Sequence, residues 1–431
     1  MLEGFLSRIE TREARIAILG LGYVGLPLSS LFVQEGFRVT GFDVNPVYVQ
    51  NLMSGVSTVL DVPDSELQTL LDSGRFRATA VIEEIRAADV YVICVPTPLD
   101  KSRQPDMSYI SSALQLLMGI WETGKLVVLE SKTYPGTTEE VLLPALSRPD
   151  CRLDRDFLLA FSPERVDPGN QAFPLRQIPK VVGGVSMDST TGAAALYRTV
   201  FEKVHVVSKA RTAEICKLLE NTFRNVNIAL VNEFAQICET LDVDVWEAIE
   251  AARTKPFGFM AFYPGPGIGG HCIPLDPQYL VFKARLHGYE PRLVALADQI
   301  NQEMPRLVVY KAMDRMNRRG RALRGAKVLI MGVAYKPDIP DSRESPADPV
   351  IEGLLQQGAV VSYSDPHVPV FRMERGETLE SVPFTAETLE ASDLVIILTA
   401  HRNFDLGLLD RVRDRVLDTR NALGDPSLRA L

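Results

Sequence analysis

Cysteine is scarce in this chain. The 431 residues include five cysteines, and no two of them have C-x-x-C spacing. We therefore predict no zinc or other metal site, and an odd number of thiols without a secretion signal is typical of the reducing cytoplasm. Cys94 lies in an apolar run and is expected in a buried strand, while Cys216 and Cys238 follow a helical pattern and are expected to pack. Only Cys272 has a loop of unusual composition around it.

Long apolar runs are missing as well. No run approaches the about 20 residues that a membrane-spanning helix needs, so we expect no membrane segment. The N-terminus carries acidic residues and lacks the basic start and apolar core of a secretory signal. Lys and Arg number 46 against 55 Asp and Glu, and the net charge of −9 does not favour nucleic acid as a partner.

Strands that alternate with helices indicate an α/β protein. Arg15–Gly20 is typical of a buried strand, and a helix through Phe32 and a second strand at Phe37–Asp43 follow it. Further strands are expected at Val90–Val95 and Leu126–Leu129. This alternation predicts a parallel sheet with helices on both faces.

Residues 212–241 are expected to form one long helix, because apolar residues recur at every third or fourth position. The stripe consists of Ile215, Leu219, Phe223, Val226, Leu230, Phe234, Ile237 and Leu241. A helix of about 45 Å exceeds the needs of one domain, so it is expected to connect two domains and to offer a surface for self-association. Lys217 and Asn221 lie nearly opposite the stripe, where they either meet solvent or stabilise an oxyanion.

A second α/β pattern follows the long helix, with strands expected at Lys327–Val333, Ala359–Ser364 and Leu394–Thr399. We therefore predict two Rossmann-like doubly wound domains joined by a central long-helix region, with bounds at 1–205, 206–305 and 306–431. The last domain lacks a glycine fingerprint and should hold a different ligand. Lys336 and Arg343 follow its first strand and are either phosphate ligands or surface charges.

A nucleotide-binding pattern lies near the N-terminus. Gly20, Gly22 and Gly25 form G-x-G-x-x-G between a strand and a helix, where backbone amides can approach a pyrophosphate. Asp43 ends the second strand and is placed to bind the adenosine ribose. No arginine follows it directly, which favours NAD over NADP. The alternative is a glycine turn in another kind of α/β protein.

The segment Phe262–Pro277 is rich in glycine and proline and is predicted to be neither helix nor strand. Cys272 is either a nucleophile that a substrate approaches closely or a small residue that fills a tight loop. Asp276 lies four residues further on, and His271 is expected to point away from the thiol. A redox cofactor together with a positioned thiol suggests oxidation of a carbonyl through a thioester.

Taken together, these segments resemble the UDP-glucose/GDP-mannose dehydrogenase family from Gly20 to Val416–Asn421. The loop G-G-H-C-I-P-x-D-P, with S-P-E-R-V-x-P-G upstream at residues 162–169, is similar to the branch that acts on UDP-N-acetylhexosamines. The UDP-glucose branch usually has another residue before the cysteine and a lysine before the aspartate, where this chain has His271 and Leu275.

The resemblance implies NAD as cofactor, a UDP-sugar as substrate and a homodimer through the long central helix. It implies a four-electron oxidation of the C6 hydroxyl in which Cys272 forms the thioester, Lys217 and Asn221 stabilise the oxyanion, and Asp276 activates water with help from Glu164 and Thr133. The implied cofactor contacts are Gly20, Gly22, Tyr23, Val24, Gly25, Asp43, Thr97 and Thr133. The implied substrate contacts are Glu164, Arg165, Val166, Lys217, Asn221, Phe262, Tyr263, Gly265, Gly269, Lys336 and Arg343.

We therefore expect a cytoplasmic UDP-N-acetylhexosamine 6-dehydrogenase that acts on UDP-N-acetylglucosamine and makes a uronic acid for polysaccharide synthesis. UDP-N-acetylmannosamine and UDP-glucose are alternative substrates. A two-electron β-hydroxyacid dehydrogenase also pairs a Rossmann domain with a helical domain bearing Lys and Asn, but it leaves the Cys272 loop and the last domain unexplained. A non-catalytic nucleotide-sugar sensor is disfavoured by the presence of Cys272, Lys217 and Asn221.

Overall fold

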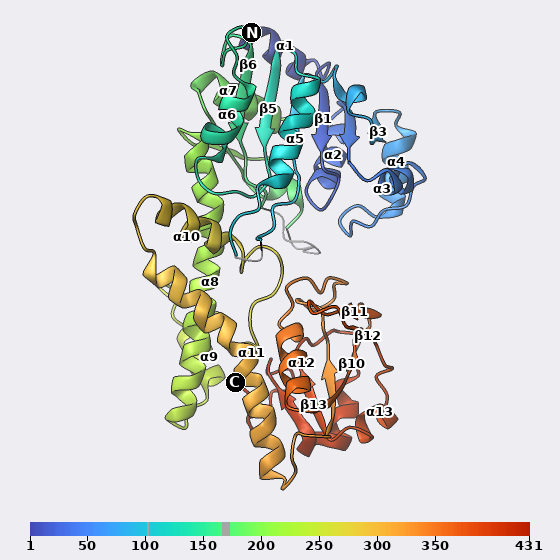
Figure 1. Cartoon of the computed structure of the whole chain (residues 1–431), viewed down its shortest axis with the longest axis vertical. Coiled ribbons are helices and arrows are strands. Elements are labelled where there is room, and N and C mark those ends of the chain that lie inside the picture. The colour runs from blue at the N-terminus through green and yellow to red at the C-terminus, as the bar shows by residue number, and fades with distance from the viewer. Residues whose placement is uncertain (101–102, 166–172) are drawn as a thin grey trace. The chain divides into compact units, whose positions relative to one another are not determined.

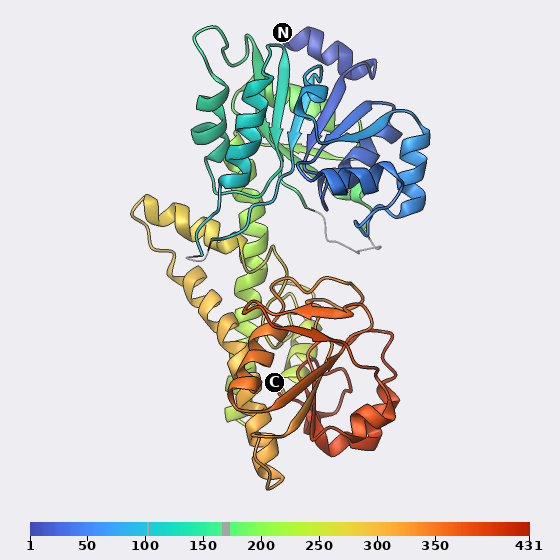
Figure 2. The same cartoon turned by 45° about the vertical axis from the view of Figure 1, so that its right-hand side comes forward.

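The computed structural model describes residues 1–100, 103–165 and 173–431. The chain divides into two compact units, one made of Met1–Glu220 and Gln278–Gly288 and the other of Asn221–Pro277 and Tyr289–Leu431. Figure 1 and Figure 2 show the course of the chain through both units from two sides. The three domain ranges predicted above stay a prediction.

In the first unit, the described residues form an eight-stranded sheet in the order β3-β2-β1-β4-β5-β6-β7-β8. Strands β1 to β6 are parallel, and β7 runs antiparallel to β6. The strands are β1 (Arg15–Leu19), β2 (Arg38–Phe42), β3 (Phe76–Thr79), β4 (Val90–Ile93), β5 (Lys125–Leu129), β6 (Phe157–Phe161), β7 (Lys180–Gly184) and β8 (Val204–Val206). Because the strand order reverses between β1 and β4, ligands are expected at the carboxyl ends of these strands.

Both faces of this sheet are covered by helices (Figure 1). Ile16 and Ile18 of β1 join one apolar cluster, and Ala17 and Leu19 join another, as side-chain alternation requires. The first cluster packs against α1, α2, α3, α4 and α7, and the second against α5, α6 and the start of α8. The helices are α1 (Leu2–Glu10), α2 (Gly25–Gln34), α3 (Pro46–Met53), α4 (Asp64–Asp72), α5 (Ser108–Gly119), α6 (Leu143–Leu146) and α7 (Met187–Tyr197).

The second unit contains a smaller parallel sheet in the order β10-β9-β13-β14. Helices α11 and α12 pack on one face, and α13 with the 3-10 segment Leu406–Arg415 packs on the other. The elements are β9 (Lys327–Met331), β10 (Val360–Ser364), β11 (Val370–Arg372), β12 (Thr378–Glu380), β13 (Leu394–Ile397), β14 (Val416–Asp418), α11 (Arg292–Arg318), α12 (Ala347–Gln356) and α13 (Ala386–Glu390). The predicted fold class, two Rossmann-like sheets with a central long helix, is confirmed.

The long central helix is α8 (Ala210–Thr240), and α9 (Val245–Arg253) packs against its second half. Its apolar stripe faces outward, since Leu219 is 64% and Phe234 51% exposed. Its polar face is the buried one, since Lys217 is 6% and Asn221 0% exposed. The alternative in which these two residues meet solvent is therefore wrong.

Two local expectations need correction. Cys94 lies just after β4 and is only partly buried, because the strand ends at Ile93. The segment from Phe262 is irregular as predicted, but its last two residues begin helix α10 (Asp276–Leu286), so Asp276 sits in a first helical turn. Among the described residues, the helices lack the combination of length and apolarity that spanning a membrane requires.

Candidate active site

The glycine-rich turn between β1 and α2 is closed tightly by its own backbone. Gly20 has φ +92°, and a Cβ there would lie 2.8 Å from the carbonyl oxygen of Cys94. A Cβ on Gly25 would lie 1.9 Å from the carbonyl oxygen of Gly20. A Cβ on Gly22 would meet nothing within 4 Å, so the space beside this part of the turn is open. The turn therefore brings backbone amides to a helix N-terminus and leaves room for a pyrophosphate.

Asp43 follows β2 and faces this turn. Its carboxylate accepts the N–H of Leu21 at 3.2 Å and that of Asn45 at 3.0 Å. Tyr23 and Val24 lie between the second and third glycines. The tight glycine turn, the open space beside Gly22 and the Asp43 carboxylate together fit NAD. NAD accepts hydride when bound.

Two predicted threonines lie on loops that follow neighbouring strands at the same edge of the sheet. Thr97 follows β4, and its carbonyl oxygen accepts the hydroxyl of Tyr279 at 2.5 Å. Thr133 follows β5, is buried, and has its hydroxyl 2.5 Å from that of Thr137. The hydroxyl of Thr133 is therefore engaged within its own loop.

The first turns of α8 hold the loop after β5. The Glu214 carboxylate accepts the N–H of Gly136 at 2.5 Å, and the N–H and hydroxyl of Thr138 at 2.9 and 2.7 Å. Burial raises the pKa of Glu214, although these donors act in the opposite direction. Glu214 is not among the residues predicted from the sequence.

One turn further along, α8 contacts the loop that follows β6. Lys217 Nζ lies 3.5 Å from Glu164 Oε2, and both residues are 6% exposed. Arg165 forms an ion pair with Glu220 of the same helix at 2.6 Å. The structure thus brings Glu164 and Arg165 against the same face of α8 as Lys217, while Val166 lies outside the described residues.

A buried network that was not predicted supports this loop. Lys180 Nζ lies 2.8 Å from Glu130 and donates to the carbonyl oxygen of Pro163 at 3.3 Å. The hydroxyl of Tyr197 donates to the other oxygen of Glu130. Because buried lysine and glutamate require partners, this network fixes the backbone just before Glu164.

In the second unit, Cys272 is partly buried and begins the turn that leads into α10. Its carbonyl oxygen accepts the N–H of Leu275 at 3.3 Å and that of Asp276 at 2.9 Å. The side-chain amide of Asn221 donates to Asp276 Oδ2, and Arg224 donates to Asn221 Oδ1. Asp276 is fully buried. The structure thus brings Asn221 and Asp276 together and adds Arg224, which was not predicted from the sequence.

The glycines before Cys272 allow close packing. A Cβ on Gly265 would lie 2.5 Å from Arg420 Nη1. A Cβ on Gly269 would lie 2.5 Å from the Cβ of Tyr335. The Arg420 side chain could move to admit a larger residue at Gly265, whereas at Gly269 the backbone carbonyl oxygen of Glu344 also lies 3.0 Å from the added Cβ, so Gly269 is the position that requires glycine.

Two aromatic residues at the start of the same loop contact neighbouring helices. Phe262 packs edge-on against Phe223 of α8, with ring centroids 5.9 Å apart. Tyr263 stacks on Trp246 of α9 at 5.4 Å, and its hydroxyl donates to Glu250. Both predicted substrate residues therefore have contacts that fix their rings.

The loop after β9 lies beside these glycines. The N–H of Gly270 donates to the carbonyl oxygen of Arg343 at 3.2 Å. The Arg343 side chain is exposed and forms an ion pair with Asp341 at 2.7 Å. Burial acts to raise the pKa of Asp341, but Arg343 outweighs it and the pKa is lowered. Lys336 lies earlier in the same loop and is partly buried.

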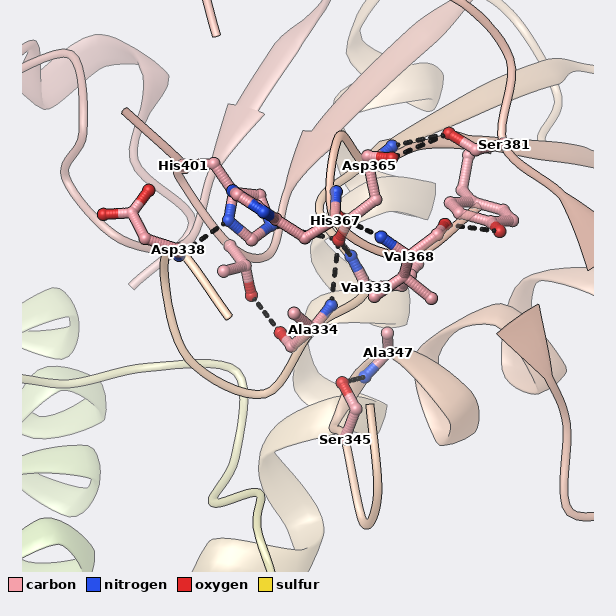
Figure 3. A network of polar contacts seen from close by, with 12 residues as sticks. Val333, Ala334, Asp338, Ser345, Ala347, Asp365, His367, Val368, Ser381 and His401 are labelled. Carbon is pink, nitrogen blue, oxygen red and sulfur yellow. Dashed lines mark hydrogen bonds and ion pairs between the residues drawn. The ribbon is translucent and has the colours of Figure 1, made fainter. Parts of the chain in front are cut away.

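Asp365 fills the turn that follows β9 (Figure 3). Its carboxylate accepts the N–H groups of Val333, Ala334, His367 and Val368 at 2.8 to 3.0 Å and lies 3.0 Å from His401 Nε2. Burial acts to raise the pKa of Asp365, but the hydrogen bonds from His401 and the backbone outweigh it and the pKa is lowered. In the first unit Asp43 is only half-buried. Asp365 is therefore engaged within its own turn, whereas Asp43 keeps part of its side chain exposed.

Asp338, His367 and His401 offer ligand atoms within 4.8 Å of one another. His401 Nδ1 accepts the N–H of Asp338 at 2.9 Å, and His401 Nε2 faces Asp365 (Figure 3). The Asp338 carboxylate pairs with Arg402 at 2.6 Å. Since both nitrogens of His401 are engaged, this cluster is a hydrogen-bonded junction and offers no lone pair on His401 to a metal.

Three sequence models of one family match the chain: the NAD binding domain at residues 14–201, the central domain at 211–303 and the UDP binding domain at 329–425. A UDP-N-acetyl-D-mannosamine dehydrogenase of Methanococcus maripaludis is 34% identical over 95% of this chain and 93% of its own. A UDP-N-acetyl-D-glucosamine 6-dehydrogenase of Pseudomonas aeruginosa is 34% identical over 91% and 92%. The solved UDP-D-ManNAc dehydrogenase of Pyrococcus horikoshii superimposes with a TM-score of 0.86, 33% identity and coverage of 94% and 95%. The chain belongs to the UDP-glucose/GDP-mannose dehydrogenase family and is an NAD-dependent UDP-sugar dehydrogenase.

Proposed function

We propose that the chain oxidises the C6 hydroxyl of a UDP-N-acetylhexosamine to a carboxylate through a thioester on Cys272. One alcohol, two NAD⁺ and one water give one carboxylate, two NADH and three protons. The observation that carries this proposal is the hydrogen-bonded series from Arg224 through Asn221 to Asp276, four residues after the thiol. This series fixes the Asn221 amide of α8 against the Asp276 carboxylate, which lies in the segment that presents Cys272.

The proposed chemistry assigns a task to each residue. The Cys272 sulfur bonds to the aldehyde carbon and later leaves as water cleaves the thioester. Lys217 and Asn221 are one turn apart on the continuous helix α8, so both can donate toward one oxyanion. Asp276 orients the water, and Glu164 and Thr133 are proposed to assist it.

The proposed ligand contacts complete the assignment. NAD is proposed to contact Gly20, Gly22, Tyr23, Val24, Gly25, Asp43, Thr97 and Thr133. The UDP-sugar is proposed to contact Glu164, Arg165, Val166, Lys217, Asn221, Phe262, Tyr263, Gly265, Gly269, Lys336 and Arg343.

UDP-N-acetylglucosamine is the proposed substrate, and the P. aeruginosa relative of that name supports it. UDP-N-acetylmannosamine is the second candidate, because the M. maripaludis relative and the P. horikoshii structure carry that name. The test is kcat/KM for UDP-N-acetylglucosamine, its manno and galacto epimers, and UDP-glucose. The highest value is expected with UDP-N-acetylglucosamine. A higher value with the manno epimer would select the second candidate, and a preference for UDP-glucose would refute the N-acetyl requirement.

The enzyme is proposed to act as a homodimer in the cytoplasm. The exposed apolar stripe of α8 supports a homodimer formed through this helix, since a contiguous exposed apolar surface marks an interaction site. We place the activity in the cytoplasm, where the Cys272 thiol stays reduced. The uronic acid product would supply polysaccharide synthesis.

A further inference from the structure

Three asparagine side chains are buried where α8 and α11 touch, and none has a role in the proposal above. Asn225 and Asn232 on α8 are 1% and 0% exposed, and Asn301 on α11 is 5% exposed. A buried amide destabilises a fold unless its polar atoms are paired. The partners of these side chains therefore indicate what they contribute.

The side-chain amides of Asn232 and Asn301 are linked by a hydrogen bond whose donor and acceptor are fixed. Asn232 Nδ2 donates to Asn301 Oδ1 at 3.0 Å, and Asn301 Nδ2 donates to the carbonyl oxygen of Asn225 at 3.0 Å. Reversing either amide would bring two donors or two acceptors together, so both orientations are fixed. Asn232 then presents Oδ1 to the loop, where it accepts the N–H of Gly265 at 3.0 Å.

The same helix also reaches the other end of the loop. Asn225 Nδ2 donates to the carbonyl oxygen of Ile273, the residue after Cys272, at 3.4 Å. Asn225 and Asn232 are seven residues apart on α8, two turns along one face. The glycine-rich loop is therefore held before and after the thiol by a single rigid helix.

We infer that Asn225, Asn232 and Asn301 are positioning residues for the Cys272 thiol, an inference that rests on the proposed function. In the step that they serve, the sulfur bonds to the C6 aldehyde carbon, the thiol proton passes to solvent, a hydride passes to the second NAD⁺, and the thioester remains. A misplacement of about 1 Å in such an attack costs about 100-fold in rate. The first oxidation, from alcohol to aldehyde, needs no thiol.

Asn232→Leu is the main test, because leucine has a similar size and no polar side-chain atoms. The second oxidation is expected to slow by about 100-fold while the first keeps its rate. A hydroxylamine trap should then capture free aldehyde, and NADH per sugar should fall below two. Asn301→Leu should act in the same direction, and the double variant should be no slower than Asn232→Leu because the two side chains act in series.

Asn232→Asp separates hydrogen bonding from packing. A protonated aspartic acid offers a donor to Asn301 and an acceptor to Gly265, as asparagine does, whereas the ionised form offers only acceptors. Burial raises the pKa of an aspartic acid, so activity relative to wild type should rise as pH falls from about 8 to about 6. A ratio that stays constant across this range would contradict the inferred role.

Asn227→Leu on α8 is the matched control, because the Asn227 amide donates to the carbonyl oxygen of Phe223 in its own helix at 2.7 Å. The second measurement is the rate at which iodoacetamide alkylates Cys272, which mass spectrometry of the Cys272 peptide follows. This rate should change in Asn232→Leu and Asn301→Leu, and it should stay at the wild-type value in the control. Unchanged alkylation together with two NADH per sugar in both variants would overturn the inference. A wild-type protein that forms one NADH per sugar would overturn the proposed function instead, and the alkylation rates would still test the positioning.

Discussion

The side-chain amide of Asn221 donates a hydrogen bond to the carboxylate of Asp276, the residue that begins α10 four positions after Cys272. This bond joins the long helix to the segment that carries the thiol. Arg224 donates to the oxygen of the same amide and thereby sets which end of the amide faces Asp276. The amide of Asn221 and the carboxylate of Asp276 are thus held in one orientation.

Replacing Arg224 tests whether this orientation matters. Arg224→Met keeps most of the aliphatic stem and removes the donor to Asn221 Oδ1. We expect kcat to fall by about 10- to 100-fold, the value of one charged hydrogen bond. The melting temperature should fall as well, because the buried Asn221 Oδ1 loses its donor. Arg318→Met on α11, where the arginine pairs with Asp314, is the control. Wild-type kcat in Arg224→Met would show that Arg224 does not set the amide.

Asp43 is predicted to determine the affinity for the cofactor. Asp43→Ala removes the carboxylate that accepts the N–H of Leu21 and is placed for the ribose. We expect KM for NAD⁺ to rise by about 10-fold or more and KM for the UDP-sugar to stay the same. Asp72→Ala at the end of α4 serves as the control. Equal changes in both KM values would argue against a cofactor-specific role.

Glu214 gives a pH prediction for stability. Burial raises the pKa of Glu214 above the usual 4.5. Between 4.5 and the raised pKa, the folded protein therefore holds a proton that the unfolded chain has lost. Because of this difference, the free energy of unfolding falls as pH rises through this range. Glu214→Gln cannot titrate. The melting temperature of the variant relative to wild type should therefore increase as pH rises above 4.5. A difference that stays constant or decreases over this range would show that burial does not raise this pKa.

The outward stripe of α8 predicts self-association. Leu219→Glu and Phe234→Glu each place a charge in the exposed apolar surface, and sedimentation should then show a shift from dimer to monomer. Met187→Glu on α7 replaces an even more exposed apolar residue away from the stripe and should leave the dimer intact. A wild-type protein that sediments as a monomer would refute the proposed dimer.

The course of α8 could be predicted from the sequence, whereas its buried face could not. Apolar periodicity predicted a helix over 212–241, and the helix spans Ala210–Thr240. Periodicity locates a stripe but does not tell whether the core or a partner covers it. A second stripe could have been recognised, because polar residues recur at helical spacing on the buried face: Glu214, Lys217, Asn221, Asn225 and Asn232.

Pairs that are distant in the sequence escaped prediction for a different reason. Lys180 and Glu130 are 50 residues apart, and His401 and Asp365 are 36 apart. Local patterns show single buried charges but do not say which of them meet. Asp365 could have been identified by analogy with Asp43, since each acid follows the second strand of its Rossmann-like sheet.

The most direct test of the account is the number of NADH formed per UDP-N-acetylglucosamine consumed, in wild type and in Cys272→Ala. A thioester on Cys272 predicts two NADH per sugar in the wild type, and at most one, with aldehyde that a hydroxylamine trap captures, in the variant. Should UDP-N-acetylglucosamine not turn over, the same ratio is measured with the manno epimer. Two NADH per sugar in Cys272→Ala, or one in the wild type, would contradict the proposed mechanism.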